Sequence, residues 1–156
     1  MKTKIALGAI ALSIASFTAS ANTKNPAAEQ AGKKIFAAFQ HSAYREYNSL
    51  VPSLSELLQV MDAHASFYGA YLADAKVEMG KQYERDVKGI EESFARALEQ
   101  GKLNHIAWSK AKFVSAEREN ENLIIEFTVD GASHKIQVAV AEIEGELHAG
   151  RFIAFI

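Results

Sequence analysis

The hydrophobic residues of this 156-residue chain change their spacing near Gly101, and that change constrains the fold more than any other feature. Before this point, apolar residues recur at intervals of three and four, which is the period of an amphipathic helix. After it, apolar and polar residues alternate, which is the period of a half-buried strand. A run of helices followed by a run of strands is typical of the α+β class. We therefore expect a helical half over about 26–101 and a sheet half over about 108–156.

The helical half carries two clear helix starts. Asn25 and Pro26 suit the cap and the first position of a helix, because Asn accepts a backbone hydrogen bond there and Pro has no N–H to lose. Ser53 and Glu56 have the spacing of a capping box, which predicts another helix start. Between them, residues 43–50 are typical of a short helix.

The last part of the helical half has the most regular amphipathic pattern, and we expect Gly101 to end its helix. Helical character extends over 63–100, and Gly69, Gly80 and Gly89 each weaken this stretch, which favours a break within it. The apolar positions of the amphipathic stretch are Val87, Ile90, Phe94, Ala97 and Leu98.

The sheet half contains four segments with alternating apolar residues, separated by short turns. Asp130-Gly131 is a strong hairpin signal, and Glu144-Gly145 predicts another tight turn. Consecutive strands joined by tight turns form an antiparallel meander, which buries one face against helices. We therefore predict N-terminal helices packed on a C-terminal four-stranded antiparallel sheet. The four strand segments are 110–119, 123–129, 136–140 and 148–156.

The first 21 residues have the pattern of a secretory signal peptide. Two lysines precede an uncharged, mostly apolar run over 5–17, and small residues Ala19 and Ala21 form an A-x-A cleavage site. The apolar run is shorter than the roughly 20 residues that span a bilayer. We expect cleavage after Ala21, a periplasmic location, and one α+β domain over 22–156.

Composition excludes several classes of function. The chain has no cysteine, so it has no disulfide, no thiolate nucleophile and no Cys-ligated zinc. The formal net charge is −2 and becomes −4 when the two leader lysines are removed, which argues against nucleic-acid binding. No His pair has metal-ligand spacing, and no nucleophile motif or Gly-rich phosphate loop occurs. We expect no metal, no cofactor and no catalytic residue set.

The aromatic residues suggest a binding surface. Tyr combines an apolar ring with a polar tip, which suits a pocket mouth, an interface or the rim of a core. If the sheet encloses a cone, an apolar ligand could lie in it, with Asp62, His64 or His148 as a general acid or base. The alternative is that the aromatic residues form the core and the ionisable groups are solvated. The five aromatic residues that we expect to line such a pocket are Tyr68, Tyr71, Trp108, Phe127 and Phe152.

Two stretches of the sequence support a comparison with a known structural group. The residues 36–39, Tyr44, 47–50 and Pro52, and later the entry into the sheet over 106–114, resemble small exported bacterial proteins of the nuclear transport factor 2-like and cystatin-like group. The resemblance implies helices packed against a curved antiparallel sheet, sometimes with a pocket at its open end. Members of that group include enzymes, ligand binders and proteins of no known activity, and no catalytic motif carries over.

Three functions compete on these observations. The first is an exported, non-catalytic binding module that holds a small apolar or amphipathic ligand, or a protein partner, against the open face of the sheet. The second is a small lyase, isomerase or hydrolase that uses an acid or base in a pocket. The third is an inhibitor or immunity-type protein, which would show a flat or protruding surface rather than a pocket. A homodimer through the open sheet face is a further expectation.

Overall fold

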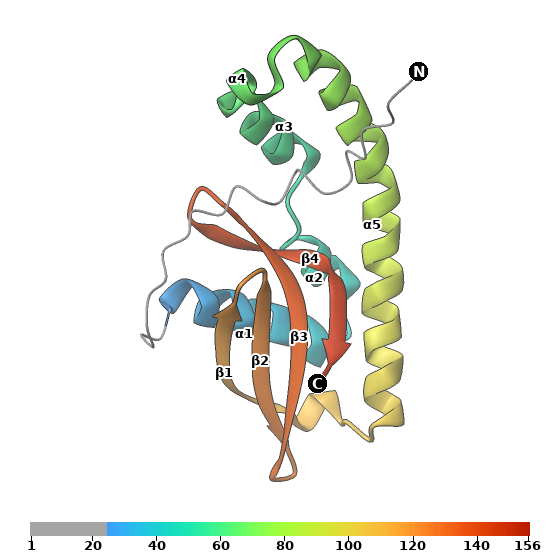
Figure 1. Ribbon diagram of the computed structural model, residues 1–156. Helices are drawn as coiled ribbons and strands as arrows, with labels where there is room; N and C mark the ends of the chain where they lie inside the picture. Colours follow the sequence, from blue (N-terminus) through green and yellow to red (C-terminus); the bar gives the residue numbers. More distant parts are fainter. Residues whose placement is uncertain (1–24) are drawn as a thin grey trace.

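The computed structural model describes residues 25–156, and the predicted leader over 1–21 lies outside them. It confirms the α+β class, with helices packed on a four-stranded antiparallel sheet in the order β1-β2-β3-β4 (Figure 1). The elements are α1 (Pro26–Gln40), α2 (Tyr44–Asn48), α3 (Leu54–Ala63), α4 (Ala65–Tyr68), the 3₁₀ turn η2 (Gly69–Tyr71), α5 (Leu72–Leu103), the 3₁₀ turn η3 (Trp108–Lys110), β1 (Lys112–Glu119), β2 (Asn122–Val129), β3 (Ala132–Ile143) and β4 (Glu146–Phe155).

Both predicted helix starts are confirmed. The Asn25 side chain accepts a hydrogen bond from the Ala27 N–H at 3.0 Å, and Pro26 occupies the first turn of α1. At the start of α3, the Ser53 hydroxyl accepts from the Glu56 N–H at 3.2 Å, and the Glu56 carboxylate accepts from the Ser53 N–H at 2.7 Å. These bonds satisfy N–H groups that lack a partner inside the helix.

The hairpin turns follow the chemistry of their residues. Asp130-Gly131 and Glu144-Gly145 both have positive φ at each position, as a two-residue hairpin turn requires. Gly131 and Gly145 accept φ of 87° and 84° without the strain that a Cβ would bring. The register places Leu123, with its alternate neighbours along β2, on the buried face.

The core lies between α1, part of α5 and one face of the sheet, and rings fill much of it. Phe39 stacks on Trp108 at a centroid distance of 5.1 Å, and Trp108 stacks on Phe127 at 5.1 Å. Phe39 also meets Phe94 of α5 at 4.8 Å. The Tyr47 hydroxyl, inside this cluster, donates to the Gly150 carbonyl at 2.8 Å and so ties α2 to β4. Aromatic contacts of this kind add to the hydrophobic stabilisation of a core.

The last helix is longer than the sequence predicted. The prediction that Gly101 ends it is wrong, because α5 continues to Leu103. Gly101 instead lies against the indole of Trp108, where an added Cβ would be only 2.7 Å from the Trp108 Nε1. The first strand also begins later than expected, at Lys112, because residues 108–110 form η3. The break predicted from glycine falls at Gly69, where φ is 55°.

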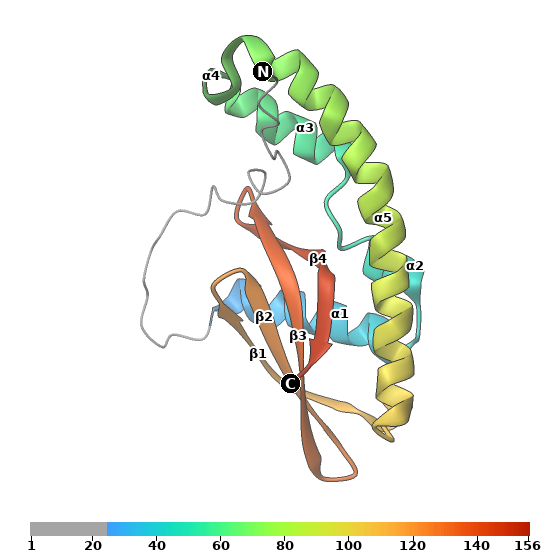
Figure 2. The same ribbon diagram turned by 45° about the vertical axis from the view of Figure 1, so that its right-hand side comes forward.

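The helices divide into a body and an arm. We call residues 54–87 the arm: α3, α4 and η2 fold back against the first half of α5, beyond the end of the sheet (Figures 1 and 2). In the arm, Met61 is the only residue classed as buried. The buried residues of α5 all lie in its second half, at Gly89, Ile90, Phe94, Ala97 and Gly101. The arm therefore projects from the body with little core of its own.

Candidate functional site: the tip of the arm

The structure separates the five aromatic residues that we expected to line one pocket. Trp108 and Phe127 stack in the core, with exposed fractions of 7% and 0%. Tyr68 and Tyr71 lie at the far end of the arm, in α4 and η2. Phe152 lies on β4 and is 55% exposed. These residues therefore occupy three places: the core, the end of the arm and the surface of the sheet.

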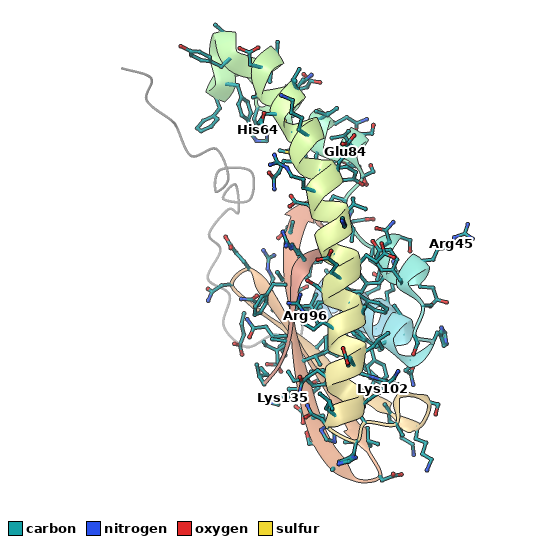
Figure 3. The ribbon with its side chains drawn as sticks, turned by 90° about the vertical axis from the view of Figure 1, so that its right-hand side faces the viewer. Arg45, His64, Glu84, Arg96, Lys102 and Lys135 are labelled. Carbon is teal, nitrogen blue, oxygen red and sulfur yellow. The ribbon has the colours of Figure 1, made fainter. Side chains whose placement is uncertain are left out.

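The candidate acid and base residues are also apart from one another. Asp62 forms an ion pair with Lys76 across the arm. His64, near the outer end of the arm in Figure 3, has its Nδ1 at 2.9 Å from the Val60 carbonyl oxygen. His148 lies on β4. Among residues 25–156 no Asp, Glu or His is buried, and no group of three or more metal-ligating side chains is close enough to hold an ion.

The hollows at the described surface are polar or open to solvent. One, of about 120 Å³, lies between α3 and the β3–β4 hairpin, and its lining combines three glutamates with a histidine. There the pKa of Glu56 lies below its usual value, because the Ser53 hydroxyl and N–H bond its carboxylate; nearby His148 also contributes. Another hollow, of about 450 Å³, opens between α1 and α2 and has no aromatic lining. Neither is lined by any of the five predicted aromatic residues. The lining of the first is Glu56, Gln59, Val60, Ile143, Glu144, Glu146 and His148.

The open face of the sheet is mixed rather than apolar. Figure 1 shows α1 behind the sheet and no described helix in front of it. Next to the apolar Ile124, Glu126 accepts a hydrogen bond from Ser133 at 2.9 Å and forms an ion pair with Lys135 at 3.6 Å. A face with ionic and polar side chains between its apolar ones needs no cover.

The end of the arm carries an uncharged, aromatic surface. We call residues 63–73 the tip; they read AHASFYGAYLA and contain no Asp, Glu, Lys or Arg. Phe67 is 67% exposed and Tyr71 is 76% exposed. Phe67 contacts Tyr68 edge to face at 5.3 Å between ring centroids. Val77, one turn further along α5, is exposed as well. Grouped exposed apolar side chains of this kind mark interaction surfaces, whereas isolated ones are ordinary.

Acidic residues border the tip on both helices. Asp62 precedes it in α3, and Asp74 follows it in the first turn of α5. Asp62 is neutralised by Lys76, and Glu78 faces Lys81 at 3.6 Å and Arg85 at 3.4 Å. Asp74 has no ion-pair partner among the described residues. The tip is therefore an apolar surface with a weakly negative border.

The sequence indicated the aromatic excess but not where it would be placed. Phe67, Tyr68 and Tyr71 belong to the aromatic excess that the sequence assigns to a core rim or a binding surface, but only Tyr68 and Tyr71 of these belong to the predicted pocket lining. The signal that could have found the tip is the run of eleven uncharged residues between Asp62 and Asp74, with a glycine near its centre. A charge-free run around a predicted helix break indicates the end of a helical hairpin.

The comparisons with known proteins found no match for this chain. No family model matches it, and neither does any curated protein or solved structure. The resemblance to the nuclear transport factor 2-like and cystatin-like group stays a prediction. Among the helices of residues 25–156, none combines the length and apolar character that a bilayer crossing requires.

Proposed function

We propose that this chain is an exported, non-catalytic binding module that contacts a protein partner through the tip of its arm. The observation that carries the proposal is the exposure of Phe67 and Tyr71 together at the end of a projecting helical hairpin. Large apolar side chains at an exposed tip lose contact with water when a partner covers them, and aromatic side chains dominate the energetics of many interfaces.

The arm has the mechanical form of a contact element. Met61 is the one buried residue of the arm, so packing within the arm contributes little to its stability. The ten-residue α3 is shorter than helices that are stable alone in water, so it depends on packing against α5. A partner that covers the tip would add the apolar contacts that the arm lacks within its own chain.

A small apolar ligand is less well supported than a protein. Ligand sites are concave and mostly apolar, whereas five of the seven residues that line the hollow beside α3 are polar or charged. The aromatic residues with the largest exposure are on a protrusion, where a small molecule would stay in water on most sides. A protrusion suits insertion into a cleft or groove of another protein.

Photo-crosslinking from the tip tests the proposal. We would place a benzoyl-phenylalanine at Phe67 and, as the matched control, at Leu103, which is 68% exposed at the opposite end of α5. The chain would carry its own leader and be expressed in its native host. We expect an adduct with one identified protein from position 67 and not from position 103.

Binding of that purified protein completes the test. The double change Phe67→Ala and Tyr71→Ala should weaken binding by tenfold or more, and Leu103→Ala should leave it unchanged. Circular dichroism melting would show that each variant still folds. Identical adducts from both positions would refute the proposal, as would crosslinking to lipid alone.

An inhibitor is the second candidate, because a protruding tip is the surface that such a protein presents to the cleft of an enzyme. If the crosslinked protein is an enzyme, the intact chain should lower its activity and the double alanine variant should not. If an enzyme binds the tip and keeps its full activity, the inhibitor hypothesis is excluded and the proposal of a non-catalytic binding module stands.

A further inference from the structure

The charges around the tip indicate which kind of surface it meets. On the arm, Asp62, Asp74 and Glu78 border the tip. Lys76 pairs with Asp62, and Lys81 and Arg85 face Glu78, so the unpaired carboxylate of this border among the described residues is that of Asp74. Below the arm, Glu144 and Glu146 at the turn between β3 and β4 share a hollow with Glu56 of α3. Figures 1 and 2 show this end of the sheet under the arm.

The turn between β1 and β2 lies at the same end of the sheet, because β1 ends there and β3 ends there too. The end of β1 and this turn add Glu117, Glu119 and Glu121, and Arg118 of β1 forms an ion pair with Glu142 of β3. The end of the molecule that carries the tip is therefore negative, although the tip itself is uncharged.

This charge distribution discriminates between the surfaces that an apolar tip can meet. An anionic membrane would be repelled by the carboxylates, since like charges near one another are destabilising. A second copy would bring the same acidic residues together, because a two-fold interface joins identical patches. A protein surface with lysine or arginine around an apolar contact would be attracted, and such complementarity guides both encounter and register.

We propose that the partner of the tip is a protein surface on which an apolar contact is bordered by lysine and arginine. The proposal rests on the proposed function and specifies its partner class. Phe67 and Tyr71 provide the apolar contact, and the basic side chains of the partner lie against Asp74 and the glutamates of the β3–β4 turn. Aromatic rings also accept cations on their faces, which adds to the attraction.

The sequence of the crosslinked peptide gives the first readout. The adduct formed from position 67 would be digested and the attached partner peptide identified by mass spectrometry. We expect apolar residues with lysine or arginine within a few positions, and a crosslinked peptide whose only charges are acidic would overturn the proposal.

Salt dependence and neutral variants give the second readout, measured on the purified partner. Raising NaCl from about 0.05 to about 0.5 M should weaken binding roughly tenfold, because salt screens attraction between exposed charges. Asp74→Asn and Glu144→Gln should each weaken binding about two- to fivefold at low salt. Asp130→Asn is the matched control, since Asp130 is exposed in the β2–β3 turn at the other end of the sheet.

The outcomes separate this proposal from the proposed function. If Phe67→Ala abolishes binding but salt and the neutral variants leave binding unchanged, the tip binds a protein, and the proposal that lysine and arginine border the contact on the partner is refuted. If sedimentation shows a doubled mass of the pure chain that Phe67→Ala removes, a second copy covers the tip and the cationic partner is refuted. If position 67 crosslinks to nothing more than position 103 does, both proposals fail.

Discussion

Two glycines in helix interiors test how closely the helices pack, because the same change to alanine should have opposite effects at the two positions. At Gly80 in α5, an added Cβ meets nothing within 4 Å. At Gly32 in α1, an added Cβ would lie 2.2 Å from the Ala116 Cβ of β1. Carbon atoms pack at about 3.5–4.0 Å, so α1 and β1 would have to move apart by more than about 1 Å.

The magnitudes follow from these two environments. Alanine exceeds glycine in helix propensity by about 1 kcal/mol, so Gly80→Ala should stabilise the chain by about 0.5–1 kcal/mol. Gly32→Ala gains the same propensity but adds an overpacking cost of about 1–3 kcal/mol, and the very short contact places it near the upper end. We expect a net loss of about 1–2 kcal/mol. For a domain of this size, each kcal/mol shifts the melting temperature by about 4 °C.

Thermal and urea unfolding of the two variants, followed by circular dichroism, measure these effects. The double variant Gly32→Ala, Ala116→Gly is the control, because removal of the Ala116 Cβ relieves the contact that causes the loss. It should show a favourable coupling of about 1 kcal/mol or more in a double-mutant cycle. If Gly32→Ala is as stable as Gly80→Ala, then α1 does not lie against β1 as described and the reasoning is wrong.

Four further predictions concern buried and capping groups. Tyr47→Phe leaves the Gly150 carbonyl without its donor and should lower the free energy of unfolding by about 1–2 kcal/mol. Burial raises the pKa of Tyr47, so the folded chain keeps a proton that the unfolded chain loses above about pH 10; stability should fall with rising pH there, less steeply in Tyr47→Phe. The free energy of unfolding of both proteins would be measured by urea unfolding at several values above pH 10, and an equal fall with pH in the two would contradict this prediction. Ser53→Ala should cost about 1 kcal/mol by removing the cap of α3, and unchanged urea unfolding would refute that role. The lowered pKa of Glu56 makes its stabilisation present above about pH 4.3 and lost as pH falls, so Glu56→Gln should flatten the acid limb of the stability curve; an unaltered limb would exclude this contribution.

The fold was largely predictable because its signals are local. The Asn25 cap, the capping box at Ser53 and the hairpin at Asp130-Gly131 each depend on residues a few positions apart. The alternation along β2 also follows directly from its sequence. Helix ends that depend on distant contacts were not predictable in the same way. Gly101 looks like a helix stop, but it allows the indole of Trp108 to approach the helix closely.

The candidate site was predictable in its residue type and not in its position. Tyr71 and Trp108 look alike as aromatic residues, yet one is 76% exposed and the other 7%. The difference arises because α5 extends beyond the sheet. The regular amphipathic pattern of α5 begins at Val87, where the helix meets the body, but it does not say whether the residues before Val87 pack against another part of the chain. Phe152 shows the same limit, since the alternation of β4 separates two faces but does not say that its face of the sheet is left open.

The construction of α5 has a mechanical consequence. The helix is held at Gly89, where the Arg151 side chain of β4 lies against it, and at Gly101 under Trp108. The Val87 carbonyl accepts from the Tyr44 hydroxyl and Asp86 pairs with Arg151, and from Asp86 to Leu72 the helix extends for roughly another 20 Å, at 1.5 Å per residue. The outer part of α5 therefore moves together with the part that packs on β4, because the two parts are one continuous helix. Gly89 and Gly101 lie roughly 18 Å apart along the helix, so a lateral shift of α5 at Gly101 relative to Gly89 becomes a displacement about one and a half times as large at its outer end. A force on the tip is transmitted back along α5 to Arg151 and the edge of the sheet.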